Sequence, residues 1–247
     1  MDLWQGKIYR MEDIYSILKE EILMLKLHPG AVISETEIAQ RFHVSRTPVR
    51  SAFGKLRGDR LINIVPQKGT YVTLLDFDYI QQLVYMREKI EHHILLNAIK
   101  HQTTAFMERL LINLQAQKKL LSGHSAVDQA AFFQLDGQFH QHCYALSNKE
   151  KLWSILDQID NQYTRYRILY YSVSKCFEIL YREHCKMFKI ISERHTWQAE
   201  DFCRAHLNGY AADINNYIRK HYASFFVQPE PTQELGEVSD GSVAFFQ

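Results

Sequence analysis

Proline is scarce in this chain of 247 residues, and its distribution divides the sequence into parts. Only 5 prolines occur, and none lies between Pro66 and Pro229. Because a proline inside a helix costs about 3 kcal/mol, so long a stretch without one is typical of a helical bundle. The expected helices span roughly residues 77–100, 103–121, 127–146, 149–171, 174–194 and 197–223. The polar sequence after Val227 predicts a flexible tail over 228–247.

Other absences narrow the class of protein. No apolar run approaches the roughly 18 residues that a membrane span needs, and the first residues lack the apolar core of a signal peptide. The 4 cysteines form no C-x-x-C pair, which favours buried thiols in a reducing compartment. We therefore expect a soluble, cytoplasmic protein with no membrane partner. The net charge of +1 indicates no partner, but residues 41–60 contain six basic side chains against Asp59 alone.

The first 75 residues predict three helices followed by a two-stranded wing. Apolar residues recur at three- and four-residue spacing from Met11 to Leu25, which predicts an amphipathic first helix. Beyond Gly58, the segments 61–65 and 70–73 favour strand, and the four residues Pro66-Gln67-Lys68-Gly69 favour a turn between them. This order of elements is typical of a winged helix-turn-helix.

Two serines are expected to begin the second and third helices. Ser34 and Glu37 form a capping box, in which the serine hydroxyl accepts from the Glu37 amide and the carboxylate reaches back. The helix that follows is predicted over Glu35–Phe42. Ser45 is expected to cap the third helix, which runs from Arg46 to about residue 57.

The third helix has the composition that a major-groove helix needs. Arg46 and Arg50 are four residues apart, so both project from one face, where they can neutralise phosphate and read guanine edges. The free amides of the first turn also suit a phosphate. Six basic residues could equally form a solvated helix face, so the composition alone does not decide.

About forty consecutive residues, Ile33–Val72, resemble the DNA-binding domain of GntR-type transcription regulators, with the blocks SETEIAQRF, VSRTPVR and GTYV in order. The resemblance implies that Arg46, Thr47 and Arg50 make the main base and phosphate contacts. One departure is Ser51-Ala52-Phe53-Gly54, where the family more often has Glu-Ala-Leu.

The same resemblance implies further DNA contacts outside the third helix. The hydroxyls or amides of Ser34 and Ser45 are expected to be available to phosphate as well as to the helix ends. Gln67, Lys68 and Gly69 are expected at the wing tip, where the backbone approaches the minor groove.

Four residues of the second half could form a metal site. Asp136 and His140 are four apart on one predicted helix, and His184 and His206 lie on two later helices. A carboxylate and three imidazoles can hold a divalent transition metal. With 12 histidines in the chain, however, spacing alone leaves hydrogen-bonded or solvated histidines as the alternative.

The segments QLDGQFHQHCYALSNKEKL, YREHCKMFKII and FCRAHLNGY resemble the signature segments of the FCD effector domain, which is common in the FadR subfamily of GntR regulators. The resemblance covers about residues 80–222 and implies a bound zinc or nickel ion. The matching metal ligands are Asp136, His140, His184 and His206. In the segment YMREKIEHHIL, Arg87 is expected to point into the cavity and pair with a carboxylate ligand, whereas Glu88 and Glu91 are expected to be structural.

Together these resemblances imply a mainly α-helical transcription regulator, not an enzyme. We expect a winged helix-turn-helix over 1–75 and an all-helical effector domain over 76–227. A homodimer would bind a palindromic operator, and a small carboxylate at the metal site would change its affinity. A regulator that senses metal alone, a metal-dependent hydrolase, and a regulator that binds an acyl-CoA-type ligand are the alternatives. The complete set of aspartate and histidines argues against the last.

Overall fold

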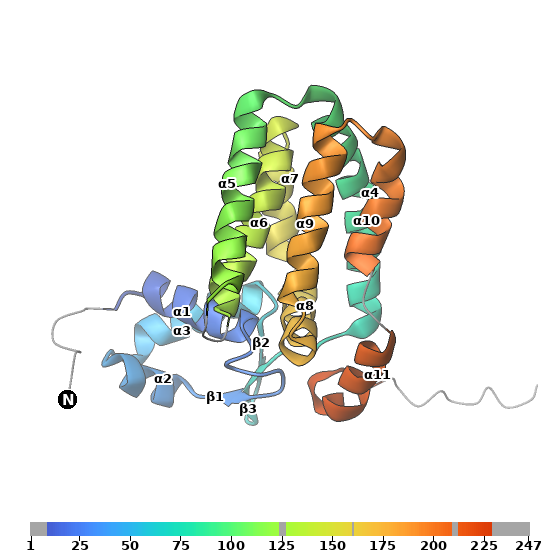
Figure 1. Cartoon of the computed structure of the whole chain (residues 1–247). Coiled ribbons are helices and arrows are strands. Elements are labelled where there is room, and N and C mark those ends of the chain that lie inside the picture. The colour runs from blue at the N-terminus through green and yellow to red at the C-terminus, as the bar shows by residue number, and fades with distance from the viewer. Residues whose placement is uncertain (1–8, 124–126, 160, 209–211, 229–247) are drawn as a thin grey trace, which may run out of the picture.

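The structure, a computed structural model, describes residues 9–123, 127–159, 161–208 and 212–228. Its N-terminal part contains three helices and a small sheet (Figure 1). The elements are α1 (Met11–Leu23), β1 (Val32–Ile33), α2 (Glu35–Phe42), α3 (Arg46–Gly58), β2 (Ile62–Val65) and β3 (Gly69–Val72). This arrangement is a winged helix-turn-helix, so the fold predicted for this part of the chain is confirmed.

The small sheet has one strand more than the sequence predicted. Its order is β1-β3-β2, and every pairing is antiparallel. The wing hairpin of β2 and β3 is confirmed, whereas β1 is only two residues long and gives no readable alternation. The first helix ends at Leu23, earlier than expected, because the backbone turns into the left-handed region at Leu25 (φ 58°).

Each helix of this part buries one apolar face and leaves the other to solvent. The buried side chains of α1 and α3 form the core with residues from α2 and the sheet. Those of α1 are Ile14, Leu18 and Ile22, and those of α3 are Val49, Ala52, Phe53 and Leu56. Because this core fixes α3 through its apolar face, the face that carries Arg46 and Arg50 stays exposed.

The rest of the described chain is helical, with more breaks than the sequence predicted. The helices are α4 (Phe77–His101), α5 (Thr104–Leu121), α6 (Gln129–Leu146), α7 (Glu150–Ile159), α8 (Asn161–Ser174), α9 (Phe177–Ser192), α10 (Ala199–Asn208) and α11 (Ala212–His221), with short 3-10 turns at Thr196–Gln198 and Ala223–Phe225. The single helices predicted over 149–171 and 197–223 are therefore wrong, since each divides into two α-helices.

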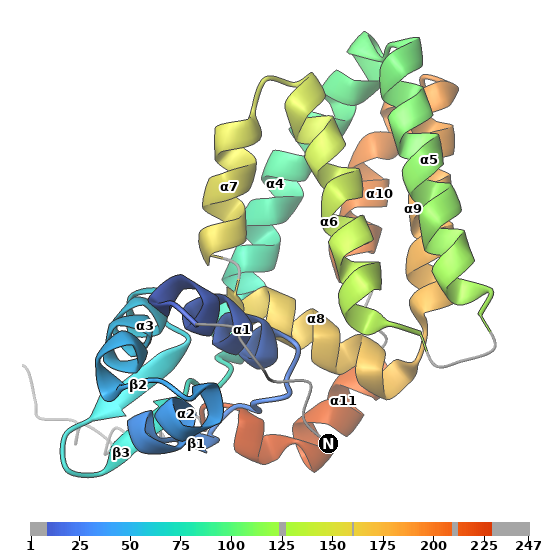
Figure 2. The same cartoon turned by 90° about the vertical axis from the view of Figure 1, so that its left-hand side faces the viewer.

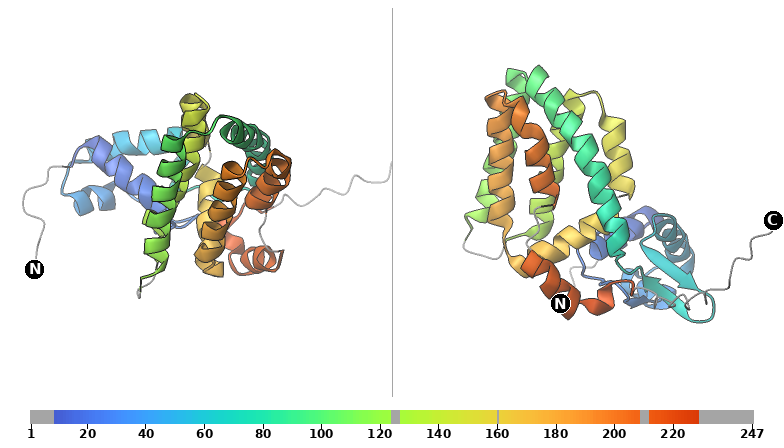
Figure 3. Two further views of the ribbon diagram at one scale, coloured as in Figure 1. Left: turned by 45° about the horizontal axis from the view of Figure 1, so that its top comes forward. Right: turned by 90° about the vertical axis from the view of Figure 1, so that its right-hand side faces the viewer.

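The upright helices α4, α5, α6, α9 and α10 pack side by side, and α8 crosses beneath them (Figure 2). The winged helix-turn-helix lies to one side of this bundle, which the views in Figure 3 show from two further directions. Helix α8 contacts both parts, since it packs against α1 as well as against α4. It is therefore the main element between the bundle and the winged helix-turn-helix.

Polar side chains of α8 hold the segment that leads from the wing into α4. The guanidinium of Arg165 donates to the Thr73 carbonyl at 2.7 Å and to the Thr73 hydroxyl at 3.1 Å. Gln162 donates to the Leu74 carbonyl and accepts from the Asp76 amide. Arg165 is fully buried, so this contact belongs to the packed interior.

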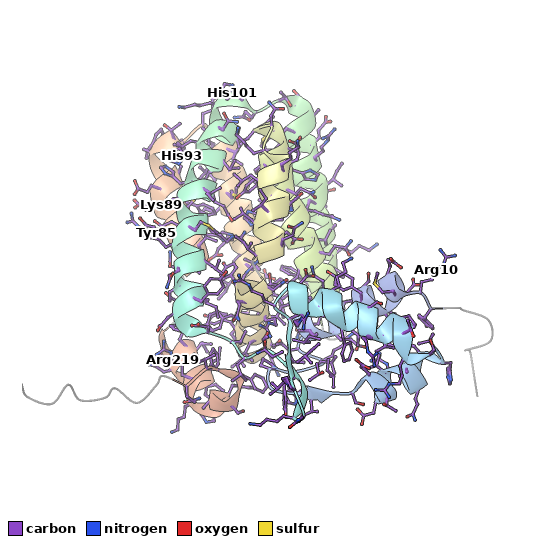
Figure 4. The ribbon with its side chains drawn as sticks, turned by 180° about the vertical axis from the view of Figure 1, so that it is seen from behind. Arg10, Tyr85, Lys89, His93, His101 and Arg219 are labelled. Carbon is purple, nitrogen blue, oxygen red and sulfur yellow. The ribbon has the colours of Figure 1, made fainter. Side chains whose placement is uncertain are left out.

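The outer side of α4 faces away from the bundle. Tyr85, Lys89, His93 and His101 recur along it at multiples of four residues, and Figure 4 shows them on the outside of the molecule. Tyr85 is 66% exposed, which is high for so large a side chain. No helix of the described chain is both long enough and apolar enough to cross a membrane.

Candidate DNA-binding and metal-binding sites

Ser34 caps α2 as its position predicted. Its hydroxyl accepts from the amides of Thr36 at 3.2 Å and Glu37 at 3.4 Å. The predicted capping box is incomplete, however, because within the described residues only the serine half of it forms. Glu37 is exposed, so its carboxylate gains little by giving up water for a single amide.

Ser45 occupies the N-cap of α3 with an extended backbone, but its hydroxyl makes no capping hydrogen bond. An N-cap hydroxyl normally accepts from the amide of the second or third helical residue. The third residue here is Pro48, which has no N–H to donate. The predicted N-cap position of Ser45 is therefore confirmed, but its exposed hydroxyl makes no cap bond and keeps its hydrogen-bonding capacity for another partner.

The two arginines of α3 lie together on its exposed face, and Glu35 joins them. Arg50 donates from Nε and Nη2 to both carboxylate oxygens of Glu35, at 3.2 and 3.1 Å. Arg46 donates to the same carboxylate at 3.3 Å. These hydrogen bonds, Arg50's first, outweigh partial burial and lower the pKa of Glu35, so the carboxylate is ionised. Thr47 is exposed beside them.

The wing tip has the strained backbone of a tight turn. Gln67 has φ 61° and Gly69 has φ 132°, a value that only glycine adopts readily. The Tyr71 hydroxyl donates to the Lys68 carbonyl at 3.0 Å and braces the turn. Gln67, Lys68 and Gly69 are all exposed, so a partner could reach both their side chains and their backbone.

The bundle brings three histidines together in its interior. His140 of α6, His184 of α9 and His206 of α10 each offer a ring nitrogen, and these nitrogens lie within 4.8 Å of one another. Nε2 of His140 and Nε2 of His206 are 3.3 Å apart. Asp136, one turn before His140, places Oδ1 3.2 Å from Nε2 of His184. All four residues predicted as metal ligands are therefore neighbours.

Each imidazole of this cluster has an oxygen atom beside its other nitrogen. Nδ1 of His184 lies 2.9 Å from Gln117 Oε1, and Nδ1 of His206 lies 2.8 Å from Glu183 Oε2. Nδ1 of His140 lies 3.4 Å from a carboxylate oxygen of Glu91. A proton on each Nδ1 satisfies these oxygens and leaves the Nε2 lone pairs directed inward.

One of the inward nitrogens lacks a hydrogen-bond partner. Nε2 of His184 is fully buried and makes no hydrogen bond, because its close approach to Asp136 lacks hydrogen-bond geometry. Burial lowers the pKa of His140 to about 3, against the opposing effect of Glu91 and Asp136, so this imidazole is neutral. Neutral imidazoles with converging lone pairs fit a divalent metal ion.

Asp136 has a partner that the sequence did not reveal. Both of its carboxylate oxygens accept from Arg167 of α8, at 3.0 and 2.9 Å. Burial alone would raise the pKa of Asp136, but the charge of Arg167 and the contact with His184 outweigh it and hold the pKa well below the usual range. The carboxylate is therefore ionised, as a metal ligand must be.

A cavity of about 520 Å³ adjoins the histidine cluster. Arg87, Asp136 and Arg167 line it on the bundle side, together with Trp153. Arg87 thus borders the cavity as expected, but its guanidinium also pairs with Glu91 through a 2.8 Å hydrogen bond. Glu91 also lies 3.4 Å from Nδ1 of His140, so it links Arg87 to the histidine cluster.

Sequence reasoning missed Glu35, Gln117, Arg167 and Glu183. None of them has a readable spacing to its partner, since the pairs are separated by 11 or 15, 67, 31 and 23 residues. Only the neighbouring helices bring these side chains together. Arg87 and Glu91, in contrast, are four apart on α4, so their pairing was open to prediction.

A winged helix-turn-helix joined to a helical bundle that contains a cluster of histidines is an architecture typical of transcription regulators. Residues 10–72 match the family model described as bacterial regulatory proteins of the gntR family, and residues 82–209 match the FCD domain. The chain belongs to the GntR family of regulators and carries an FCD domain, an architecture consistent with the FadR subfamily.

Individual relatives agree with this assignment. The chain is 29% identical over 215 residues to the HTH-type transcriptional repressor RspR of Escherichia coli, covering 87% of this chain and 92% of that protein. It is 30% identical over 220 residues to an HTH-type transcriptional regulator of Streptomyces ambofaciens, covering 89% and 91%. A GntR regulator from Rhodococcus sp. RHA1 shares the fold with a TM-score of 0.64 at 20% identity, covering 83% and 97%.

Proposed function

We propose that this regulator binds a divalent transition metal and a small carboxylate in its helical bundle, and that the bound pair changes its affinity for a DNA operator. The observation that supports the metal site is the arrangement of three imidazoles, whose Nε2 atoms converge while each Nδ1 faces an oxygen. With the proton of each imidazole on Nδ1, the Nε2 lone pairs of His140 and His206 face each other across 3.3 Å and repel, and a cation between them would remove that repulsion.

Asp136, His140, His184 and His206 would hold the ion, with zinc and nickel both suited to such donors. When bound, the metal supplies a positive centre that attracts a carboxylate ligand. Arg87 and Arg167 line the adjoining cavity, where their guanidinium groups would orient the carboxylate by paired hydrogen bonds. Their present partners, Glu91 and Asp136, keep both groups in place before the ligand arrives.

On the DNA side, we assign the reading face to α3. Arg46, Thr47 and Arg50 would contact bases and phosphates in the major groove, and the free Ser45 hydroxyl would accept or donate at a phosphate. The strained wing tip, residues 67–69, would lie at the adjacent minor groove. A homodimer would present two such faces to a palindromic operator in the cytoplasm, and the relative named as a repressor favours repression.

The cavity supports direct communication between the two parts of the protein. Glu20 of α1 and Met24, the residue directly after α1, form part of its wall, although α1 belongs to the winged helix-turn-helix. Helix α1 in turn packs against α3 through the shared core. A ligand that fills the cavity therefore touches the helix that supports the reading face, and can favour one arrangement of the two parts.

Operator affinity measured by fluorescence anisotropy tests this proposal. The duplex is selected from a random library by the wild-type protein, and affinity is measured metal-free, with zinc, and with zinc plus acetate, lactate, citrate or gluconate. We expect zinc plus one of the acids to shift the Kd by roughly tenfold, a typical coupling between two sites. His184→Ala should lose stoichiometric zinc and this response, yet still bind the duplex.

Arg50→Ala gives the complementary result. It should weaken binding to the selected duplex by about tenfold or more while zinc content stays unchanged. A response to zinc that no acid enlarges would identify a regulator that senses metal alone. Normal binding by Arg50→Ala would show that α3 is not the reading helix. The relatives are regulators, which argues against the hydrolase alternative.

A further inference from the structure

The contact of Glu35 with the two arginines is unusual for a DNA-binding face, where negative charge opposes phosphate. Glu35 is the first residue of α2, and its side chain is only 23% exposed. Arg46 and Arg50 are 60% and 69% exposed, so both remain accessible while they share the carboxylate. One acidic group thus fixes the two guanidinium groups that the proposed function assigns to DNA.

The hydrogen bonds leave each arginine with free donors. Arg50 uses Nε and Nη2, and Arg46 uses Nη2, for Glu35. A guanidinium has five N–H donors, so each arginine can hold Glu35 and still donate to another acceptor. A guanine edge presents O6 and N7 at fixed positions in the major groove, whereas phosphates line the groove on both sides. A flexible arginine side chain can turn toward phosphates, whereas an arginine held by Glu35 can donate only to the base edge that lies opposite it.

We propose that Glu35 is a specificity-determining residue, which holds Arg46 and Arg50 in register for base edges and keeps them from phosphates on other DNA. The inference rests on the proposed function, because it requires α3 to enter the major groove. Glu35 then affects binding in two ways. The fixed geometry strengthens binding to the operator alone and so discriminates, whereas the negative charge of Glu35 weakens binding to every duplex.

These two effects predict opposite consequences when the carboxylate is removed. Loss of a negative charge at the interface should tighten binding to any duplex, because repulsion from phosphate falls. Loss of the positioning should weaken binding to the operator alone. A residue that merely stabilises the fold would change both affinities in the same direction, so the ratio of the two affinities distinguishes the roles.

The test measures Kd for the selected duplex and for a scrambled duplex of the same length and composition, at two salt concentrations. In Glu35→Gln, the specificity ratio should fall by roughly tenfold, the cost of losing one good arginine–guanine pair. The scrambled duplex should bind equally well or more tightly. Glu35→Asp keeps the charge but shortens the side chain, so the ratio should fall without any gain in binding to the scrambled duplex.

Glu37→Gln is the matched control. Glu37 lies two residues further along α2, is exposed and touches neither arginine. The substitution Glu37→Gln therefore removes the same charge and leaves both arginines as they are. Its ratio should equal that of the wild type. If Glu35→Gln and Glu37→Gln give the same ratio, the inference is wrong. If Arg50→Ala also keeps the wild-type ratio, or the wild type selects no duplex, the proposed function fails instead. Thermal melting of each variant checks that it is folded.

Discussion

At the scale of single residues, the histidine cluster depends on the groups behind it. The Gln117 amide nitrogen donates to Asn113 Oδ1 at 2.7 Å, so its oxygen must face His184. Asn113 is oriented in turn by its hydrogen bond to the Leu135 carbonyl at 3.0 Å. This chain of hydrogen bonds fixes the tautomer of His184 and directs its Nε2 into the cluster.

Gln117→Leu should therefore weaken metal binding although it removes no ligand. Without the acceptor at Nδ1, His184 can protonate at Nε2 or rotate, and the affinity for zinc should fall by about 10- to 100-fold. Competition with a chromophoric zinc chelator measures the change. Gln115→Leu, an exposed position on the same helix, is the control and should keep the wild-type affinity. An unchanged affinity in Gln117→Leu would mean that this hydrogen bond does not orient the histidine.

At the scale of elements, α3 contains a glycine, which has a lower helix propensity than alanine. Gly54 lies in the middle of the helix, and a Cβ atom added there would meet nothing within 4 Å. Gly54→Ala should raise the free energy of unfolding by about 1 kcal/mol, because alanine loses less backbone entropy. Urea denaturation followed by circular dichroism measures the difference.

Gly69→Ala should have the opposite effect in the same measurement. The wing-tip glycine has φ 132°, which strains any residue with a Cβ atom, so unfolding should become easier. A stabilising Gly69→Ala, or a destabilising Gly54→Ala, would contradict the backbone conformations described above. The pair also separates helix propensity from the general effect of replacing glycine.

Local signals account for the elements that the sequence predicted well. The helix Glu35–Phe42 was found at its observed bounds because Ser34 marks its start, and α3 was found to within a residue because Ser45 and Arg46 mark its own. The pair Asp136 and His140 was readable because four residues make one helical turn. The breaks between α7 and α8 and between α10 and α11 carried no proline, so periodicity continued through them.

The partners that position the site were beyond the reach of sequence reasoning. Arg167 meets Asp136, and Arg165 meets Thr73, only because α8 crosses beneath the bundle (Figure 2). Nothing local in the sequence fixes that crossing, which results from how all the apolar faces pack together. The residues of the histidine cluster were therefore predictable by motif, whereas their supporting residues required the tertiary structure.

At the scale of the whole molecule, α8 joins the ligand cavity to the DNA-binding part. Arg167 and Thr164 line the cavity, while Arg165 holds Thr73 at the end of the wing. Arg165 and Arg167 are two residues apart, so they point to nearly opposite sides of the helix. If the proposed ligand moves α8, the contact of Arg165 with Thr73 would pass that movement to the segment that leads from the wing into α4.

Arg165→Met should break this connection without unfolding the protein. Burial lowers the pKa of Arg165 to about 10, so the group is still charged at neutral pH, yet its hydrogen bonds to Asn161 and Thr73 all go to neutral oxygens. Because a buried charge of this kind is costly, methionine of similar length should change stability little. The effect of zinc plus acid on operator affinity should shrink toward onefold, while zinc affinity stays at the wild-type value.

Hydrogen exchange and anisotropy together check this expectation. Amides of residues 73–76 should exchange faster in Arg165→Met, because the side chain no longer holds that segment. Arg182→Met, which replaces an arginine on the exposed side of α9, should retain both the slow exchange and the full response to ligand. If Arg165→Met keeps the full change in operator affinity with zinc plus acid, α8 does not transmit the effect of the ligand. The part of the cavity wall that α1 contributes would then be the connection between the ligand and the reading helix.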